Sequence, residues 1–591
     1  MGVLHSSDGI EIKVIKDVER RMKKSSKGPH RISSERPPRG IQEKKDQRSP
    51  RTHKGSVLHR SMTRGAHKAH LAPRETDPPI ELIAHNKPSI IHRDTDLLIL
   101  NKPTGWLTHP DGREGVEARP DLVSWVEQTL QLRPHIHQRL DVSTSGVIAF
   151  SLSSRGDQRL SELEHRGEKV YLAVVEGGPS QARGQVNQPV PRAPTREAIT
   201  QYQVKRRGRG WSLVEARLLT GRTHQIRFHM QTLGCPIRGD GLYGDPFDLR
   251  APRVLLHAYQ LRIQNELFQA DPPACFARYL DESIGGRADP FEAALALRAD
   301  LAESEIDECY RISNGGPEGF SGWRVDRYGE WAWVIHDEGT PEGLLPEGLR
   351  GVYRLEAMVD RSQGQQPHPV LWRGGEAPQP LIVREAGVRY AVELGEQLST
   401  GLFLDQRPQR AWLAHARQPM GRVLNTFAHA GGFSIAAARS GSETVSIDLS
   451  SRWLSRLPYQ LELNEVDPAQ HHCLTGDVFD WLHRLTKRGE RFDLIILDPP
   501  STSVGTKRKR WSAAKDYPLL VQLALPLLSP GGRLMTSTNH RKLTPSRFAT
   551  LVESAFPKGE GYYLERVCAP GVDFPSDEPL GVKNLIWRAP Q

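Results

Sequence analysis

The alternation of short β-type runs with helical stretches between residues 422 and 500 constrains the fold more than any other feature of this chain. A strand–helix–strand series of this kind builds a parallel sheet with helices on both faces. We therefore expect an α/β domain over residues 381–591. The expected strands are 422–424, 444–447 and 494–497, and the expected helices are 434–439 and 453–463.

The composition and the predicted secondary structure change along the chain, which indicates several domains. Its 591 residues are enough for roughly three or four domains. An alanine-rich helix at 292–301 and short strands at 323–325 and 331–335 predict a small α+β unit before the α/β domain. The predicted parts are a tail over 1–77, a first globular domain over 78–272, a linker over 273–290, a small α+β subdomain over 291–380 and the α/β domain over 381–591.

All of the excess positive charge lies in the predicted tail. The chain has 80 Lys and Arg against 70 Asp and Glu, a net charge of +10, and residues 1–77 hold 19 of the basic and 9 of the acidic residues. The tail also lacks sustained apolar periodicity, which is typical of a disordered segment. It either contacts a polyanion such as nucleic acid or is a solvated extension.

Cysteine usage and hydropathy exclude several classes of protein. The five cysteines form no CxxC pair and no Cys/His cluster, so neither a disulfide framework nor a metal site is predicted. No run approaches the roughly 18 apolar residues of a membrane span, and the N-terminus lacks the apolar core of a signal peptide. We expect a cytoplasmic protein with no membrane contact and no obligate protein partner.

A polar loop precedes an apolar strand in the first globular domain. Residues 139–146 read RLDVSTSG and lead into the apolar run 147–150. An Asp beside an Arg in such a loop could be a simple ion pair. Two further segments point to chemistry instead: 169–175 reads KVYLAVV, a strand that carries a tyrosine, and 218–243 reads LLTGRTHQIRFHMQTLGCPIRGDGLY.

These three segments together resemble the RluA-type RNA pseudouridine synthases over about residues 88–263, where they occur in the family's order. The resemblance implies an α+β fold with a mixed, mainly antiparallel sheet. It also implies a reaction that breaks the N–C glycosidic bond of a uridine, rotates the freed base and rejoins it through carbon, without metal or cofactor. One difference is Gln138, where the family usually has His.

The resemblance implies roles for three residues. Asp141 matches the catalytic aspartate, which acts as nucleophile or base. Tyr171 matches the aromatic residue on which the extruded base stacks. Arg227 matches the arginine that pairs with the catalytic carboxylate and keeps it ionised and oriented. The alternatives are core packing for Tyr171 and a surface ion pair for Arg227.

The α/β domain contains a glycine turn followed by acids at the ends of successive strands. Residues 423–434 read VLNTFAHAGGFS, a strand that runs through two glycines into a helix. Such a turn lets the backbone approach a ligand beside the free N–H groups of a helix N-terminus. Asp448 follows the second strand, where an acid can bind ribose hydroxyls, and Asp477 and Asp498 come later. The pattern favours a nucleoside ligand.

This half of the chain, about residues 290–591, resembles class I S-adenosylmethionine-dependent methyltransferases of the RlmI and RlmK types, which modify large-subunit ribosomal RNA. The segment 400–407, TGLFLDQR, is part of the same signature. His429-Ala430 stands where the family usually has Tyr-Thr, and Leu398-Ser399 where it has His-Lys. RlmI-type enzymes carry an N-terminal PUA domain, and here the synthase-like module occupies that place. A Rossmann-like fold is implied.

The resemblance implies S-adenosyl-L-methionine as the cofactor. Asp448 would hold its ribose, Asp477 its adenine amino group, and Asp498 would line the methyl-transfer pocket. The residues expected to bind the cofactor are Gln406, Arg407, Thr426, Phe427, Gly431, Gly432, Phe433, Asp448, Asp477 and Asp498.

The loops that would surround the methyl acceptor contain no cysteine. They read DPPSTS at 498–503 and TSTNHRK at 536–542. RNA enzymes that methylate carbon-5 of cytosine use a cysteine thiolate for covalent activation. A base nitrogen already has a lone pair, and the second loop also resembles the RlmK type more than the RlmI type. We therefore predict direct transfer to nitrogen, with guanine N7 as the first candidate.

The leading hypothesis is a bifunctional RNA-modification enzyme that isomerises uridine to pseudouridine and methylates a base of 23S large-subunit ribosomal RNA. One alternative is a methyltransferase whose synthase half serves only as an RNA-binding module. Another is a non-catalytic ribosome-assembly factor. The matched residues Asp141, Tyr171 and Arg227 disfavour the first alternative, and the three acids disfavour the second. RNA, either 23S rRNA or a large-subunit precursor, is the expected partner.

Overall fold

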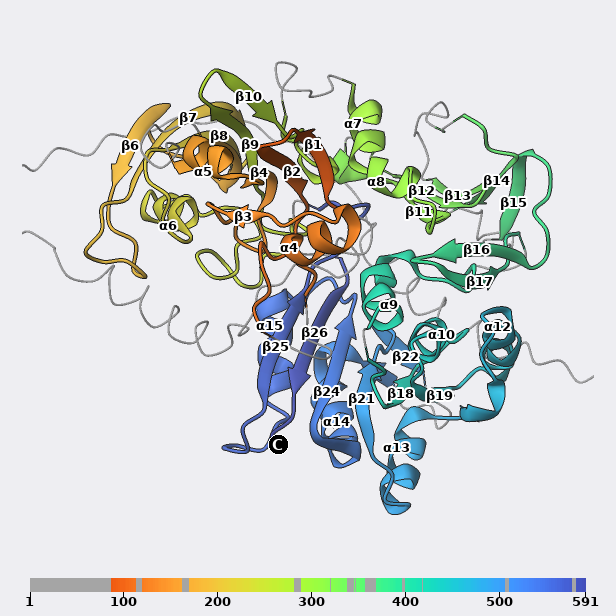
Figure 1. Ribbon diagram of the computed structural model, residues 1–591. Helices are drawn as coiled ribbons and strands as arrows, with labels where there is room; N and C mark the ends of the chain where they lie inside the picture. The colour runs from red at the N-terminus through yellow and green to blue at the C-terminus, as the bar shows by residue number, and fades with distance from the viewer. Residues whose placement is uncertain are drawn as a thin grey trace, which may run out of the picture. The chain divides into compact units, whose positions relative to one another are not determined.

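The computed structural model describes the chain from residue 87 to its end, apart from short internal segments (Figure 1). The predicted tail, its expected RNA contact and residues 281–288 of the predicted linker lie outside the described residues. Within the described part, no helix is both long and apolar enough to cross a membrane. The described residues are 87–112, 119–161, 169–280, 289–318, 320, 322–336, 345, 347–356, 368–395, 399–416, 418–504, 510–576 and 581–591.

The N-terminal half is built on a ten-stranded sheet, which confirms the predicted mixed, mainly antiparallel fold. Its main order is β1-β2-β4-β9-β5-β8-β7-β6, and the β4–β9 pair is parallel. The elements are β1 (Ser89–Arg93), β2 (Leu97–Lys102), α4 (Leu122–Trp125), β3 (His135–Ile136), β4 (Ser145–Ser151), α5 (Ser154–Ser161), β5 (Lys169–Glu176), β6 (Arg183–Asn187), β7 (Ile199–Gly208), β8 (Trp211–Leu218), α6 (Gln225–Thr232), β9 (Leu256–Ile263) and β10 (Glu266–Gln269).

Strand β4 is buried on both faces because it lies inside the sheet. Ile148 and Phe150 pack with Leu122 of α4 in one cluster, whereas Val147 and Ala149 join the larger cluster on the other face. Since successive side chains of a strand point to opposite faces, a continuous apolar run is what such a position requires. This fixes the strand that follows the loop of Asp141.

A small α+β subdomain follows. Its five strands lie in the order β11-β12-β13-β14-β15, and β16 and β17 form a separate hairpin. The prediction of one helix over 292–301 is partly wrong, because the chain leaves helical geometry at Arg298, whose buried guanidinium bonds Glu318. The elements are α7 (Pro290–Leu297), α8 (Ala299–Ala302), β11 (Cys309–Asn314), β12 (Trp323–Tyr328), β13 (Trp331–His336), β14 (Gly351–Glu356), β15 (Pro369–Gly374), β16 (Leu381–Glu385) and β17 (Val388–Val392).

The C-terminal half has the predicted α/β architecture. Its sheet order is β20-β19-β18-β21-β24-β26-β25, parallel from β20 to β24 and antiparallel at β26 and β25. The elements are α9 (Arg407–Ala414), β18 (Arg422–Thr426), α10 (Gly432–Arg439), β19 (Glu443–Asp448), α11 (Ser451–Leu454), α12 (Leu457–Leu463), β20 (His471–Thr475), α13 (Val478–Lys487), β21 (Phe492–Leu497), β22 (Thr502–Val504), β23 (Arg510–Ser512), α14 (Ala513–Ala524), β24 (Leu528–Thr538), α15 (Pro545–Glu553), β25 (Tyr563–Cys568) and β26 (Lys583–Arg588).

The alternation of side chains along the central strand β21 creates two helical layers. Leu494 and Ile496 pack with residues of α9 and α10, while Ile495 and Leu497 pack with residues of α13, α14 and α15. Figure 1 shows α14 and α15 beside this sheet. The three predicted strands are confirmed as β18, β19 and β21. Their parallel pairing places their carboxyl ends along one edge.

The prediction of one helix over 453–463 is wrong. The structure has two helices, α11 and α12, and Pro458 lies in the first turn of α12. Proline has no N–H to continue the preceding helix, and its ring favours a helix start. After the break, α12 begins at Leu457, which packs against the glycine turn. The Leu457 side chain lies 2.6 Å from the position that a Cβ on Gly431 would occupy.

A fully buried ion pair ties helix α9 to the segment before β26. The guanidinium of Arg407 bonds both carboxylate oxygens of Asp573, and neither side chain is exposed. Asp573 also accepts a hydrogen bond from the backbone N–H of Arg311 at 2.9 Å. One carboxylate therefore joins the C-terminal half to the small subdomain.

We predict that Asp573→Asn destabilises the C-terminal half by about 3–5 kcal/mol, because it removes the negative charge that faces the buried guanidinium of Arg407. Chemical denaturation followed by tryptophan fluorescence measures this. The control is Glu330→Gln in the exposed pair with Arg350, whose side chains are 49% and 67% exposed. That change should stay within about 0.5 kcal/mol of the parent, and equal losses in the two variants would contradict the prediction.

Candidate active sites

The loop of Asp141 is held to the first sheet from two sides. Lys102 is fully buried, and its Nζ donates to the carbonyl oxygens of Pro103 and Thr144 at 3.0 and 2.7 Å. Gly146 has a φ of +114°, and a Cβ there would lie 2.1 Å from the carbonyl oxygen of Ala258 on β9. The loop geometry therefore requires glycine where β4 meets β9. These contacts fix the backbone that carries Asp141.

The carboxylate of Asp141 lies beside two basic side chains. The Nη1 atom of Arg227 is 3.7 Å from Asp141 Oδ2, and the Nε2 atom of His224 is 3.8 Å from Asp141 Oδ1. The Asp141 side chain remains about one-fifth exposed, so a substrate can reach it. The structure therefore brings Asp141 and Arg227 together as the sequence predicts, at a distance longer than a hydrogen bond.

Arg227 has a closer partner than Asp141. Its Nε and Nη2 atoms donate to Asp240 at 2.7 and 2.8 Å, and both side chains are buried. Asp240 Oδ1 also accepts hydrogen bonds from the backbone N–H groups of Leu242 and Tyr243. The predicted pairing with Asp141 is thus the weaker of two contacts. Asp240 orients the guanidinium and leaves Nη1 toward Asp141.

Tyr171 lies on β5 and is 8% exposed within the large hydrophobic cluster of this half. Burial, together with the nearby charge of Asp141, raises the pKa of its phenol above the ordinary value. The ring is therefore held neutral beside Asp141.

The sequence interpretation assigned no role to His224, Asp240 or Tyr243. All three lie in the segment 218–243, and Tyr243 OH is 3.1 Å from His224 Nδ1. Burial lowers the pKa of His224, against the charge of Asp141. The only signal in the sequence was their place in the same motif as Arg227.

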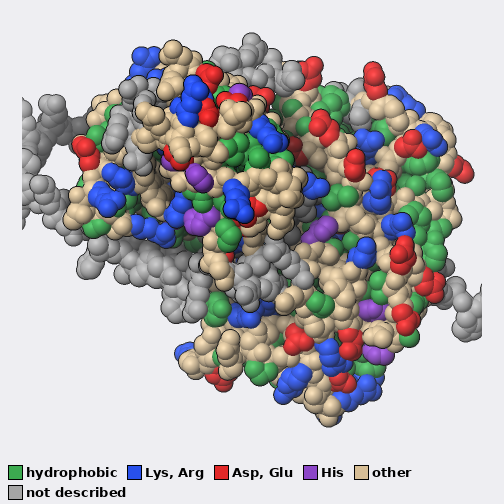
Figure 2. Space-filling view, in the orientation of Figure 1, with side chains coloured by type: hydrophobic (Ala, Val, Ile, Leu, Met, Phe, Trp, Pro, Cys, Tyr) green, Lys and Arg blue, Asp and Glu red, His purple; other side chains and the backbone are tan. Residues whose placement is uncertain are grey.

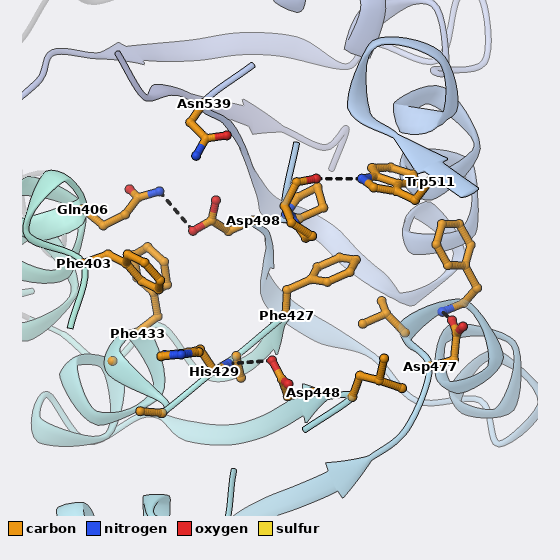
Figure 3. Close-up of a pocket in the computed structure, with 18 of the residues that line it drawn as sticks. Phe403, Gln406, Phe427, His429, Phe433, Asp448, Asp477, Asp498, Trp511 and Asn539 are labelled. Atoms are coloured by element: carbon orange, nitrogen blue, oxygen red, sulfur yellow. Dashed lines mark hydrogen bonds between the residues drawn. The ribbon is translucent and has the colours of Figure 1, made fainter. Parts of the chain in front are cut away.

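The second site is a cavity of about 990 Å³ at the carboxyl edge of the parallel sheet (Figure 3). This is near the upper end of the roughly 300–1,000 Å³ typical of ligand pockets. Seven of the ten predicted cofactor residues line it. They are Gln406, Phe427, Gly432, Phe433, Asp448, Asp477 and Asp498.

The other three predicted cofactor residues lie outside the cavity lining. Arg407 is buried against Asp573, because its side chain turns away from the site into the ion pair described above. Thr426 is buried and donates to the carbonyl oxygen of Ile496 at 2.7 Å. Gly431 is part of the turn, with a φ of +87°. These residues support the walls of the cavity without facing it.

The glycine turn is tightly wound. Phe427 and His429 have φ values of 56° and 50°, which is uncommon for residues other than glycine and is concentrated at functional sites. The turn leads into α10, so the first N–H groups of this helix point toward the cavity side that Gly432 lines. The backbone thus offers donors where a ligand can approach closely.

Two of the acids are held by backbone donors. Asp448, at the end of β19, accepts hydrogen bonds from the N–H of His429 at 2.7 Å and of Ser450 at 2.8 Å. Asp477 caps α13 through a 2.9 Å bond from the N–H of Phe479. Both carboxylates are therefore fixed in place and still border the cavity. A nucleoside's hydroxyl and amino groups would find acceptors there.

Asp498, at the end of β21, sits in a network of buried amides. Gln406 Nε2 donates to Asp498 Oδ2 at 3.1 Å and to Ser537 Oγ at 2.8 Å, while Asn584 donates to Gln406 Oε1 at 3.0 Å. Burial raises the pKa of Asp498 to about 6, and the charge of Asp405 adds to this. The group therefore changes charge near neutral pH.

Aromatic side chains that the sequence interpretation missed complete the cavity. Phe403 is 54% exposed at its rim, and its ring centroid lies 5.1 Å from that of His429. Trp511 donates to the carbonyl oxygen of Pro500 at 2.8 Å, and Asn539 lies across from Asp498 (Figure 3). Phe403 belongs to the quoted segment 400–407 and Asn539 to the quoted loop 536–542, whereas Trp511 reaches the site only through the fold.

Comparisons with known proteins agree with both halves. A family model for S-adenosylmethionine-dependent methyltransferases matches residues 359–588, and one for RNA pseudouridylate synthases matches residues 96–232. The putative ribosomal RNA large subunit methyltransferase YwbD of Bacillus subtilis is 32% identical over 281 residues, which cover 46% of this chain and 70% of that protein. The chain belongs to this methyltransferase family. Its cofactor is S-adenosylmethionine, and its N-terminal half is a pseudouridylate synthase domain.

The chain is also similar to other known proteins. A ribosomal RNA large subunit methyltransferase of Deinococcus radiodurans is 32% identical and covers 53% of this chain and 76% of its own. A putative methyltransferase crystallised with SAH is 28% identical, with a TM-score of 0.46, 51% of this chain and 80% of its own covered. Human RNA Pseudouridylate Synthase Domain Containing 4 is 26% identical, with a TM-score of 0.26. The match covers 31% of this chain and 88% of that one.

We predict that methyl transfer depends on the ionisation of Asp498. Because its pKa is raised to about 6, the carboxylate that can accept a hydrogen bond from the acceptor base is present above pH 6 and is lost below it. The rate should fall by about tenfold per pH unit below that point. Single-turnover methylation from pH 5 to 8 measures this. Asp498→Asn should lower the rate and flatten the acidic limb, and an unchanged limb would contradict the assignment.

Proposed function

We propose that this protein carries out two modifications of RNA: it methylates a base of 23S large-subunit ribosomal RNA and isomerises a uridine to pseudouridine. The observation that carries the first activity is the cavity at the carboxyl edge of β18, β19, β20 and β21, which Asp448, Asp477 and Asp498 all line. The observation that carries the second is Asp141 beside Arg227 and Tyr171. We place the protein in the cytoplasm, where ribosomal RNA is modified.

The acids of the cavity have separate roles in methyl transfer. Asp448 binds the ribose hydroxyls of the cofactor, and Asp477 binds its adenine amino group. The cofactor supplies an electrophilic methyl group when bound. Asp498 then borders the place of transfer, and hydrogen bonds from Gln406 and Ser537 hold its carboxylate. The helix N-terminus at Gly432 and the ring of Phe433 close the same wall.

The acceptor is a nitrogen of the base, with guanine N7 as the first candidate. Among the residues that line the described cavity there is no cysteine. Cys473 lies on β20, and Cys568 lies on β25, where burial raises the pKa of its thiol to about 11. A thiol held neutral and away from the cavity cannot supply covalent activation. A nitrogen acceptor needs only to be positioned.

The synthase half acts through Asp141 as the nucleophile at the sugar. The Nη1 of Arg227 faces the carboxylate at 3.7 Å, and the ring of Tyr171 contacts the extruded base. Figure 2 shows Lys, Arg and His side chains around β3, α4 and α6, on the visible face of this half. Basic side chains there suit contact with the phosphates of an RNA strand. The alternative in which this half only binds RNA leaves the arrangement around Asp141 without a purpose.

We expect Asp141→Asn to abolish pseudouridine formation and to spare methylation. The amide keeps the shape and removes the charge, so isomerisation should fall by about 10⁴-fold or more. Both modifications are measured on ribosome-derived RNA incubated with the purified full chain.

The matched control for this substitution is Asp271→Asn, which changes an exposed aspartate of the same half. It should leave both activities unchanged. Retained isomerisation in Asp141→Asn would show that the synthase does not use this carboxylate. Loss of both activities in a folded Asp141→Asn protein would show that the two reactions do not have separate sites.

A second test addresses the acceptor atom. RNA that contains 5-fluorocytidine traps enzymes that attack carbon-6 of cytosine through a thiolate. We expect no stable protein–RNA complex, and Cys473→Ala and Cys568→Ala should keep methylation within about twofold of the parent. A trapped complex that disappears in either variant would overturn the nitrogen assignment. Mass analysis of the methylated nucleoside then identifies the atom.

A further inference from the structure

Among the described residues, Asp141 interacts with Tyr171, His224 and Arg227, and also with Lys102 and Tyr243. Of these, His224 has no role in the reaction as proposed above. Its Nε2 lies 3.8 Å from Asp141 Oδ1, and its Nδ1 lies 3.1 Å from the hydroxyl of Tyr243. The imidazole therefore points one nitrogen at the reacting carboxylate and is held by the other.

The backbone of His224 is also unusual. It has a φ of 59°, in the left-handed region, and it caps the N-terminus of α6. A residue other than glycine in this region costs free energy and occurs preferentially at functional sites. The Tyr243 ring meets the imidazole edge-on, with centroids 5.6 Å apart, and the guanidinium of Arg227 lies over the same ring. The fold thus fixes the direction of the imidazole.

The isomerisation needs a proton acceptor late in the reaction. Asp141 bonds to carbon-1′ as the N1–C1′ bond breaks and its electron pair stays on the base. After the base turns, carbon-5 bonds to carbon-1′ and displaces Asp141. Carbon-5 then carries both the sugar and its original hydrogen. Removing that proton restores the C5=C6 double bond, and N1 gains a proton, so the overall change is an isomerisation.

The other side chains are less suited to accept this proton. The Nζ of Lys102 already donates to the carbonyl oxygens of Pro103 and Thr144. Arg227 is a guanidinium bound to Asp240 and has no lone pair to offer. Burial, then the charge of Asp141, raises the pKa of Tyr171, so its phenol stays protonated. Asp141 becomes a carboxylate again only when carbon-5 displaces it, and it is then the competing acceptor that the His224 variants test. The neutral imidazole of His224 has an available lone pair.

The charges around His224 agree with this. Burial lowers its pKa, Asp141 and Asp240 raise it, and Arg227 and Arg192 lower it. The net effect lowers the pKa of His224, which favours the neutral ring before the reaction. Once it takes a proton, the released carboxylate of Asp141 lies 3.8 Å from it and stabilises the imidazolium.

We propose that His224 is the general base that removes the proton from carbon-5 after the new carbon–carbon bond has formed. This inference rests on the proposed synthase activity. Nε2 accepts the proton while the Nδ1 hydrogen bonds Tyr243, and the imidazolium then returns a proton to N1 directly or through water. Asp141 has just left carbon-1′, to which carbon-5 is now attached. Since Nε2 lies 3.8 Å from Asp141, His224 is also close to carbon-5.

The test uses RNA in which the target uridine carries fluorine at carbon-5. Fluorine cannot leave as a proton, so rearrangement of this RNA proceeds to the carbon–carbon bond and needs no base afterwards. The variant is His224→Asn, because asparagine tolerates the left-handed backbone. We expect pseudouridine formation from uridine to fall by about 10²-fold or more, while rearrangement of the fluorinated RNA stays within about threefold of the parent.

A matched control is His229→Asn on the same helix. His229 is buried and bonds Thr200 and the carbonyl oxygen of Gln188. Its substitution should therefore change the rates on the two RNAs by the same factor. His224→Gly, which fits the same backbone without a side chain, must behave as His224→Asn does. Methylation by the same preparation reports that the chain remains intact.

Each outcome decides the matter. Equal losses on both RNAs in the two His224 variants, or unchanged pseudouridine formation, would overturn the role of His224 as the carbon-5 base. A parent protein that rearranges neither RNA would instead overturn the proposed synthase function. If His229→Asn also slowed the reaction of the uridine RNA without slowing that of the fluorinated RNA, the effect would be a general one of α6. That result would also overturn the inference.

Discussion

Buried pairs of guanidinium and carboxylate groups hold the framework of both active sites. Each pair is desolvated, and each guanidinium makes two hydrogen bonds to its carboxylate, so removing one partner would leave an unpaired charge in the interior. The pairs stand next to the reacting groups and fix the elements that carry them. They are Arg227–Asp240 beside the synthase carboxylate, and Arg407–Asp573 and Arg410–Glu385 beside the methyltransferase cavity.

The two carboxylates to which we assign chemistry, Asp141 and Asp498, are constrained more loosely than these structural ones. Asp141 has its nearest cations at 3.7 and 3.8 Å and keeps part of its surface exposed. Asp498 is bound by neutral amide and hydroxyl groups, and burial raises its pKa. An acid that must meet a substrate cannot be saturated by protein cations. The division between fully paired and partly paired acids therefore separates framework from chemistry in both halves.

Much of this organisation could be predicted from local patterns. Apolar runs predicted β18, β19 and β21, and their parallel order follows from the helices between them. The loop of Asp141, the glycine turn and the acids at strand ends were recognised because short motifs keep their residue types together. Helix boundaries were predicted less well. Pro458 and the buried Arg298 end helices for reasons that a hydrophobic pattern does not contain.

The sequence by itself determined the two kinds of fold, the cofactor and the acids at the strand ends, because each depends on neighbouring residues and their spacing. The tertiary structure decided which polar residues face a site. It turned Arg407 into the core against Asp573, gave Arg227 its partner Asp240, and brought Asn584 to the amide that holds Asp498. These pairings join residues far apart along the chain, and burial selects them by the cost of leaving a charge or an amide unpaired.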